Sequence, residues 1–205
     1  MEQIIRKIVV TGGPCAGKTT AMGWIREAFS GHDYTVLFVP ETATELISGG
    51  VAPWTCGTNA EYQACQLELQ LKKEYIFDKA AKTMPADRFL IVCDRGAMDN
   101  KAYITAAEFV RVLQQLNIDE AALLRRYDAV FHLTTAAIGA EAFYTTANNR
   151  ARTESAAEAA VLDDRVCEAW KAHPHFHIID NSTDFDGKLK RLLNAIAAFL
   201  QGGNA

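Results

Sequence analysis

The residues best suited to chemistry lie in one glycine-rich stretch near the start of the chain. The spacing G-x-x-x-x-G-K-[ST], typical of a phosphate-binding loop, runs from Gly12 to Thr19. Glycines let the backbone approach an anion, and loop N–H groups and a following helix start present positive partial charge to it. In such loops the lysine reaches the β- and γ-phosphates and the hydroxyl ligates Mg²⁺. We therefore expect nucleotide contacts from Gly12, Gly13, Pro14, Cys15, Ala16, Gly17, Lys18, Thr19 and Thr20.

A second chemical pair, Asp94-Arg95, directly follows the apolar run Phe89–Cys93. In enzymes that carry a phosphate-binding loop, a carboxylate at this position binds Mg²⁺ or orients the acceptor, and an arginine holds phosphate charge. We therefore predict that Thr19 and Asp94 hold the metal and that Lys18, Asp94 and Arg95 are catalytic. The alternatives are a helix N-cap for Asp94 and a surface cation for Arg95.

Glu41 follows the apolar run Thr35–Val39 and suits a general base that takes the proton of an acceptor hydroxyl. It suits equally a second carboxylate near the metal or a glutamate favoured at a helix start by the dipole. Glu45, one helical turn later, is an alternative base.

Two arginines, Arg150 and Arg152, precede the helix-compatible segment Ser155–Ala172. Cations on such a segment can close over a triphosphate and stabilise charge in the transition state, and we expect Arg152 to be catalytic and Arg150 to bind the nucleotide. The alternative is a solvated charged loop.

The elements that must position these residues are short apolar runs that alternate with helix-compatible segments. The runs lack strict alternation, which is typical of strands buried on both faces of a parallel sheet. Strands alternating with helices predict an α/β fold, in which ligands gather at the carboxyl ends of the strands. The predicted strands are Lys7–Val10, Thr35–Val39, Phe89–Cys93, Ala129–Leu133 and Phe176–Ile179. The predicted helices are Thr19–Ser30, Asn59–Thr83, Thr105–Gln115, Ser155–Ala172 and Asp184–Gln201.

The composition limits the class of protein. A chain of 205 residues that is 49% hydrophobic suits a single domain, 1–205, that buries roughly 70% of its unfolded surface. The net charge of −4 provides no general basic surface for nucleic acid. No run approaches the ~20 apolar residues of a membrane span, no signal-peptide apolar region is present, and the five cysteines are scattered. We therefore expect a cytoplasmic protein with reduced thiols, without a transmembrane segment and without a nucleic-acid partner.

Four segments together resemble a known group of proteins. They are Thr11–Thr20, Cys93–Asp99 with Ala102-Tyr103 following, Asn149–Ser155, and Asp180-Asn181 through Phe185 to Lys188. Spanning about Lys7 to Phe199, they resemble the NadR/TRPL-translocation-defect type of P-loop NTPase (AAA-like ATP-binding) domain. That group is similar to ribosylnicotinamide kinases and, more distantly, to nucleoside and nucleotide kinases.

The resemblance implies a three-layer P-loop fold with the parallel strand order 2-3-1-4-5, helices on both faces and a lid at about residues 136–165. It also implies that Arg152 is a lid arginine and that Asn181 and Thr183 lie near the nucleotide base. The group contains kinase-like members and a GTP-binding regulator, so the resemblance leaves the acceptor open.

Residues and resemblance together predict an ATP- and Mg²⁺-dependent phosphotransferase that acts on a nucleoside, nucleotide or ribosylated cofactor precursor. The alternative is a regulatory switch that binds ATP or GTP and hydrolyses it slowly. A guanine-reading N-K-x-D is absent, because Asn100-Lys101-Ala102-Tyr103 departs from it at the last position. A Ras-like G protein is therefore disfavoured, although GTP as the cofactor in place of ATP stays open.

Overall fold

The computed structural model describes residues 3–31, 33–141 and 155–202, and among them five strands form one parallel sheet. The strands are β1 (Ile4–Thr11), β2 (Thr35–Val39), β3 (Arg88–Asp94), β4 (Ala129–Leu133) and β5 (Phe176–Ile179). Their order in the sheet is β2-β3-β1-β4-β5, with every neighbouring pair parallel. Each predicted apolar run lies within one strand, and both the parallel sheet and the implied strand order are confirmed.

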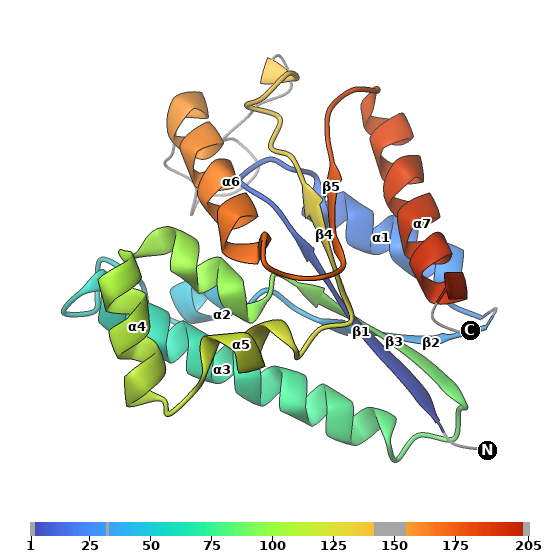
Figure 1. Ribbon diagram of the computed structural model, residues 1–205, viewed down its shortest axis with the longest axis horizontal. Coiled ribbons are helices and arrows are strands. Elements are labelled where there is room, and N and C mark those ends of the chain that lie inside the picture. Colours follow the sequence, from blue (N-terminus) through green and yellow to red (C-terminus); the bar gives the residue numbers. More distant parts are fainter. Residues whose placement is uncertain (1–2, 32, 142–154, 203–205) are drawn as a thin grey trace.

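The helices cover both faces of this sheet (Figure 1). They are α1 (Lys18–Phe29), α2 (Thr42–Ser48), α3 (Asn59–Ala81), α4 (Ala106–Gln115), α5 (Glu120–Leu124), α6 (Ala156–Trp170), α7 (Phe185–Gly202) and the 3-10 helix η1 (Ala97–Tyr103). The sequence did not predict α2, η1 and α5 as helices, because five to seven residues are too few to display a helical period.

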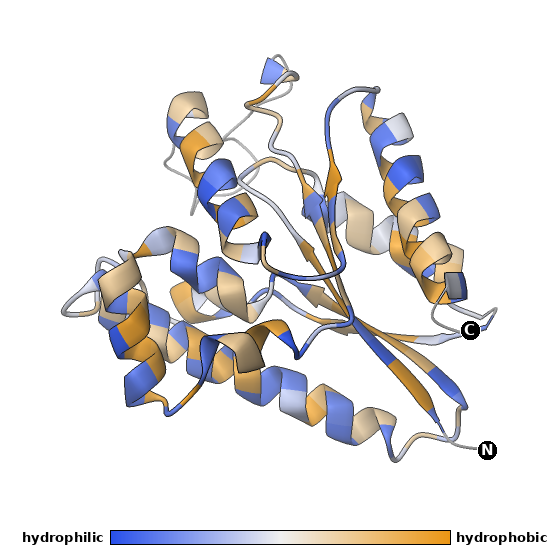
Figure 2. Cartoon of the chain, in the orientation of Figure 1, coloured by the Kyte–Doolittle hydropathy of each residue, from blue (hydrophilic) through white to orange (hydrophobic). Residues whose placement is uncertain are grey.

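Side chains that alternate along the strands divide the core into two parts. Val9 of β1 packs with buried side chains of α3, α4, α5, η1 and α6. Its neighbours Ile8 and Val10 point to the other face, where α1 and α7 cover them. Figure 2 shows largely hydrophobic strands between helices that contain both hydrophilic and hydrophobic residues. The protein is thus a three-layer α/β structure, as expected for a sheet buried on both faces.

Four of the described helices, α3, α4, α5 and α6, begin at a residue whose side chain caps the helix. Thr105 with Glu108 at α4, and Ser155 with Glu158 at α6, each form a reciprocal capping box. None of the described helices is long and apolar enough to cross a membrane.

Candidate functional site

The glycine-rich loop joins β1 to α1 at the carboxyl edge of the sheet. Gly12 and Gly17 have φ angles of 137° and 93°, and a Cβ on Gly12 would collide with the Leu133 carbonyl oxygen. Lys18 curls back over the loop, where its Nζ donates to the carbonyl oxygens of Gly12 and Gly13, each at 2.9 Å. The loop therefore has the backbone shape and the buried cation that a bound phosphate group requires.

The electrostatics of Lys18 reflect both burial and its neighbours. Burial, followed by the nearby Arg95 charge, lowers the pKa of Lys18 to about 8, although Glu41, Asp94 and Asp99 oppose this shift. The three carboxylates and Arg95 thus lie within electrostatic reach of the lysine. The structure brings Lys18, Glu41, Asp94 and Arg95 together on the same side of the sheet edge, as the sequence predicts.

Glu41 and Arg95 form a close ion pair beside the loop. Arg95 Nε lies 2.6 Å from Glu41 Oε1, and Arg95 Nη1 contacts the Gly12 carbonyl oxygen at 3.3 Å. Burial raises the pKa of Glu41, but the charges of Arg95 and Lys18 outweigh it and bring the pKa to about 2. Glu41 is also the N-cap residue of α2, although its side chain makes no capping hydrogen bond. It is therefore directed at Arg95 and the loop.

Asp99 is a site residue to which sequence reasoning gave no role. Its side chain is 1% exposed and accepts hydrogen bonds from Thr11 Oγ1 at 2.6 Å, Trp170 Nε1 at 2.6 Å and Arg95 Nη1 at 3.2 Å. Arg95 itself has a φ of 69°, which is strained for a residue other than glycine. Asp99 and Glu41 together hold the guanidinium of this strained residue against the loop.

Asp94 presents a carboxylate oxygen that has no partner. Its Oδ1 is buried and, among the described residues, accepts no hydrogen bond. Burial raises the pKa of Asp94, although the charge of Lys18 counteracts it. The N-cap of the following helix η1 is Gly96, so the alternative of an N-cap aspartate does not apply. An orphaned anionic oxygen beside the phosphate loop suits a hard cation or its bound water.

A row of buried polar side chains on α3 faces the same region, and the sequence analysis did not single it out. Tyr62, Gln66, Gln70 and Glu74 are spaced four residues apart, which places them on one helix face, and each is at most 7% exposed. In the sequence such a polar row looks like a solvent-exposed helix face, so only the packing of α3 against the sheet reveals that it is buried.

Two buried polar atoms near the N-terminal end of α3 are unpaired. Tyr62 OH and Oε1 of the adjacent Gln63 are buried without a hydrogen-bond partner among the described residues. Burial, followed by the charge of Glu41, raises the pKa of Tyr62 to about 12, so the hydroxyl keeps its proton and stays a donor. The unpaired Tyr62 donor thus lies within electrostatic reach of Glu41, and the unpaired Gln63 acceptor belongs to the next residue of the helix, so a polar ligand near the start of α3 could satisfy them.

The other side of the loop is tied to α6 and α7. Asp163 of α6 is 2% exposed and accepts the N–H groups of Gly13 at 2.6 Å and Thr135 at 3.2 Å. Lys188 of α7 donates to the Ala16 carbonyl oxygen at 3.2 Å and to the Thr134 carbonyl oxygen at 2.5 Å. Both anchors are far from the loop in sequence, and no local signal distinguishes them from surface charges.

Asn181 and Thr183 lie after β5, at the start of α7. Asn181 Nδ2 donates to the carbonyl oxygens of Thr135 at 2.8 Å and Ile138 at 2.6 Å, and its Oδ1 accepts from Lys188 at 2.8 Å. Thr183 Oγ1 accepts from Arg191 at 3.3 Å. Asn181 is connected to the phosphate loop through Lys188, which also donates to Ala16, whereas Thr183 contacts Arg191 of α7, so both side chains are engaged within the protein. The predicted lid arginines Arg150 and Arg152 lie outside the described residues.

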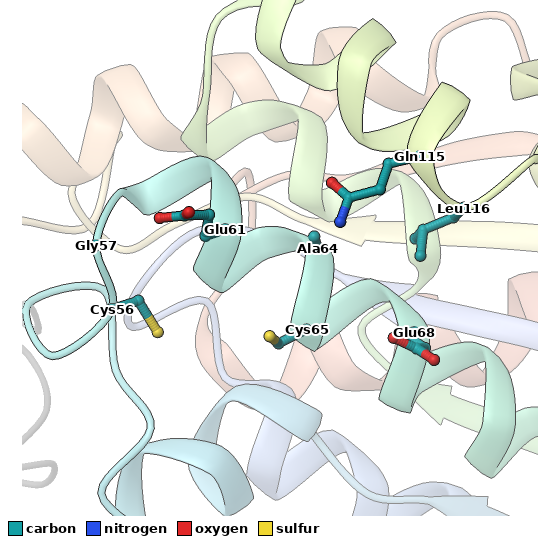
Figure 3. Close-up of a pocket in the computed structure, with 8 residues that line it drawn as sticks. All are labelled: Cys56, Gly57, Glu61, Ala64, Cys65, Glu68, Gln115 and Leu116. Carbon is teal, nitrogen blue, oxygen red and sulfur yellow. The ribbon is translucent and has the colours of Figure 1, made fainter.

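A separate hollow opens between α3 and α4, away from the phosphate loop. It has a volume of about 410 Å³ and is lined by residues that include Cys56, Glu61, Glu68 and Gln115 (Figure 3). It contains none of the residues predicted to carry chemistry. The candidate site therefore remains the sheet edge formed by the loop, Glu41, Asp94 and Arg95.

Comparisons with known proteins agree with this geometry. The family described as an AAA domain matches residues 7–188. Among solved structures, "Structure of deoxyadenosine kinase from M.mycoides with bound dATP" matches with a TM-score of 0.53 and 17% sequence identity, covering 94% of this chain and 99% of that one. None of the curated proteins matches the chain. At this level of identity the likeness shows a shared fold, that of the P-loop kinases.

Proposed function

We propose that this chain, which belongs to the AAA domain family, is a nucleotide-dependent phosphotransferase that acts on a small polar acceptor. The observation that carries the proposal is the direct contact between Arg95 and the Gly12 carbonyl oxygen while the same guanidinium holds Glu41. The proposed base Glu41, the phosphate-binding cation Arg95 and the phosphate loop thereby lie in contact. A protein that only binds nucleotide does not need a general base.

In the proposed reaction the loop residues 12–20 bind the triphosphate of ATP or GTP. Glu41 accepts the proton of the acceptor hydroxyl as its oxygen bonds to the γ-phosphorus and the bond to the β–γ bridging oxygen breaks. Lys18 and Arg95 balance charge on the transferring phosphoryl group, and the nucleoside diphosphate leaves. The solved kinase is described with bound dATP, which supports a nucleoside triphosphate as a ligand of this fold.

The residues present fit a magnesium ion that accompanies the nucleotide. The orphaned Asp94 Oδ1 and the Thr19 hydroxyl would hold it, with phosphate oxygens as further ligands. When bound, such an ion neutralises charge on the phosphate oxygens. No group of three or more His, Cys, Asp or Glu side chains within the described residues can hold a metal without such help.

The acceptor is proposed to lie between the Glu41–Arg95 pair and the start of α3. The unpaired Tyr62 hydroxyl and Gln63 Oε1 would hydrogen-bond its polar groups. An acceptor with both a donor and an acceptor of hydrogen bonds suits them, as in a nucleoside, a nucleotide or a ribosylated cofactor precursor. The resemblance of four segments to NadR-type domains supports this group of acceptors.

The test is phosphate transfer from ATP with Mg²⁺ to a panel of nucleosides, nucleotides and cofactor precursors. We expect one class to be phosphorylated by the wild-type protein and not by Lys18→Ala. Glu41→Gln should retain nucleotide binding and lose most of the transfer rate, by about 10²- to 10⁴-fold for a lost general base. If no acceptor is phosphorylated faster by the wild type than by Lys18→Ala, the proposal fails.

A second candidate is a switch that binds ATP or GTP and hydrolyses it slowly. The Arg95–Glu41 ion pair favours it, because a carboxyl with a pKa of about 2 is a weak base until the pair opens. Nucleotide-dependent binding of a partner protein, with no acceptor phosphorylated, would favour the switch.

A further inference from the structure

In a bound nucleoside triphosphate, the γ-phosphate and the nucleoside lie at opposite ends of the phosphate loop. The loop follows β1, the central strand, and the acceptor groups come from the ends of β2 and β3 on one side. In phosphoryl transfer the attacking and leaving oxygens lie roughly in line with the γ-phosphorus. If the acceptor lies on the β2–β3 side, as the proposed function requires, the nucleoside extends toward β4, β5 and α7. The present inference therefore rests on the proposed function.

An aromatic side chain lies on that route. Phe185 is the first residue of α7, and its ring packs directly on Gly17, because a Cβ on Gly17 would lie 2.5 Å from Phe185 Cε2. Figure 1 shows α7 alongside α1, whose first residue is Lys18. Phe185 is nevertheless 47% exposed. An exposed ring fixed against the last glycine of a phosphate loop offers a flat apolar surface to a purine.

The polar side chains around this ring are engaged elsewhere. The two Asn181 amide N–H groups and its oxygen bond to Thr135, Ile138 and Lys188. Arg191 donates to Asp180 at 2.8 Å and to Thr183 Oγ1. Asp184 Oδ1 accepts the Gly187 N–H at 2.8 Å and so caps the first turn of α7. These contacts engage the Asn181 amide and the two terminal nitrogens of Arg191, and they hold the β5–α7 segment. Arg191 Nε has no hydrogen-bond partner among the described residues, but it is buried and therefore closed to the edge of a base stacked on an exposed ring.

We propose that Phe185 is the stacking surface for the nucleobase and that the side chains between residues 180 and 191 do not read the edge of the base. A stacking surface accepts any purine, because every base has a π-face. The protein therefore binds ATP and GTP with similar affinity, and the base contributes to affinity through its ring rather than through its exocyclic groups.

The experiment measures the binding of ATP, GTP and inorganic tripolyphosphate, each with Mg²⁺, by calorimetry. We expect the dissociation constants of ATP and GTP to agree within about threefold. Phe185→Leu should weaken both by about tenfold while leaving tripolyphosphate unchanged, since loss of one base–aromatic stack has about this effect. Phe185→Tyr keeps the ring and should restore binding. Tyr75→Leu, which removes a comparably exposed ring from α3, serves as the matched control.

The three ligands also separate the two proposals. An equal loss of ATP, GTP and tripolyphosphate binding in Phe185→Leu would overturn the stacking role, because it would show damage to the loop. A purine preference above about tenfold would overturn the absence of base reading, and its loss in Asp184→Asn would assign the reading to Asp184. If the wild-type protein bound none of the three, the proposed function itself would fail.

Discussion

At the residue scale, Lys18 connects phosphate binding to pH. Its pKa of about 8 means that half of the nucleotide-free molecules carry an uncharged amine near that pH. Because burial penalises the ammonium in the folded state, this group destabilises the fold below about pH 8, and that destabilisation is relieved as the pH rises. A bound polyphosphate favours the ammonium and raises the pKa again.

We therefore predict that nucleotide binding takes up a proton and weakens by about tenfold per pH unit above pH 8. Calorimetry in two buffers with different ionisation enthalpies measures the uptake. Lys18→Arg, which keeps its charge over this range, should bind with little pH dependence. Burial also lowers the pKa of Lys188 to about 8. If nucleotide binding by Lys18→Arg still depends on pH, the proton taken up on binding therefore belongs to a group other than Lys18.

Asp94 leads to a prediction about the metal. Its unpaired oxygen would be the protein's carboxylate ligand, directly or through water, for an ion that also contacts phosphate. Asp94→Asn should raise the Mg²⁺ concentration needed for half-maximal transfer or hydrolysis by about 10- to 100-fold. Nucleotide binding in the presence of a chelator should not change. A variant with unaltered Mg²⁺ dependence would place the metal elsewhere.

At the element scale, α3 holds the segments that follow β2 and β3 through one buried carboxylate. Glu74 is 0% exposed; its Oε1 accepts from Gln70 at 2.9 Å and Tyr127 at 2.6 Å, and Arg126 lies 3.0 Å from its Oε2. Gln70 in turn accepts a hydrogen bond from Thr42, the residue after Glu41. The Tyr127 hydroxyl accepts the N–H of Ala97, which lies two residues after Arg95. A single helix residue thereby links the segments after β2 and β3.

Replacing that carboxylate should cost stability. Glu74→Gln leaves the partly exposed Arg126 guanidinium without its counter-charge, and we expect this to lower the free energy of unfolding by about 2 kcal/mol, because water screens part of the loss. Urea denaturation followed by circular dichroism measures it. Glu68→Gln, an exposed glutamate on the same helix, should change the value by less than about 0.5 kcal/mol. Equal effects of the two substitutions would contradict the structural role of Glu74.

The elements differ in how well the sequence predicts them, for physical reasons. Contiguous apolar residues allowed β2, β4 and β5 to be predicted to the residue, although only β4 is fully buried and the edge strands β2 and β5 are partly exposed. The loop and the residues at strand ends follow from a local motif and from the parallel sheet. Asp163 meets Gly13 across 150 residues, and Trp170 meets Asp99 across 71. Such contacts depend on helix packing, which leaves no local pattern.

At the scale of the whole molecule, β1 divides the site into two halves. Under the proposed function, the acceptor half comprises the ends of β2 and β3 with α2, α3 and η1, and the nucleotide half comprises the ends of β4 and β5 with α6 and α7. Arg95, at the end of β3, donates to a loop carbonyl, that of Gly12, and so connects the two halves. Nucleotide should therefore order one half first, and the acceptor the other.

Amide hydrogen exchange resolved by residue tests this division. ATP with Mg²⁺ should slow exchange in residues 12–20 and 180–188 and leave residues 59–74 of α3 nearly unchanged, because only the former are expected to contact the nucleotide. Lys18→Ala provides the control, in which the same addition should have little effect. Stronger protection in α3 than in the loop would mean that the triphosphate lies on the Glu41 side of β1. The β2–β3 side would then bind the nucleotide and the β4–β5 side the acceptor. Tyr62 would contact the nucleotide and Phe185 the acceptor.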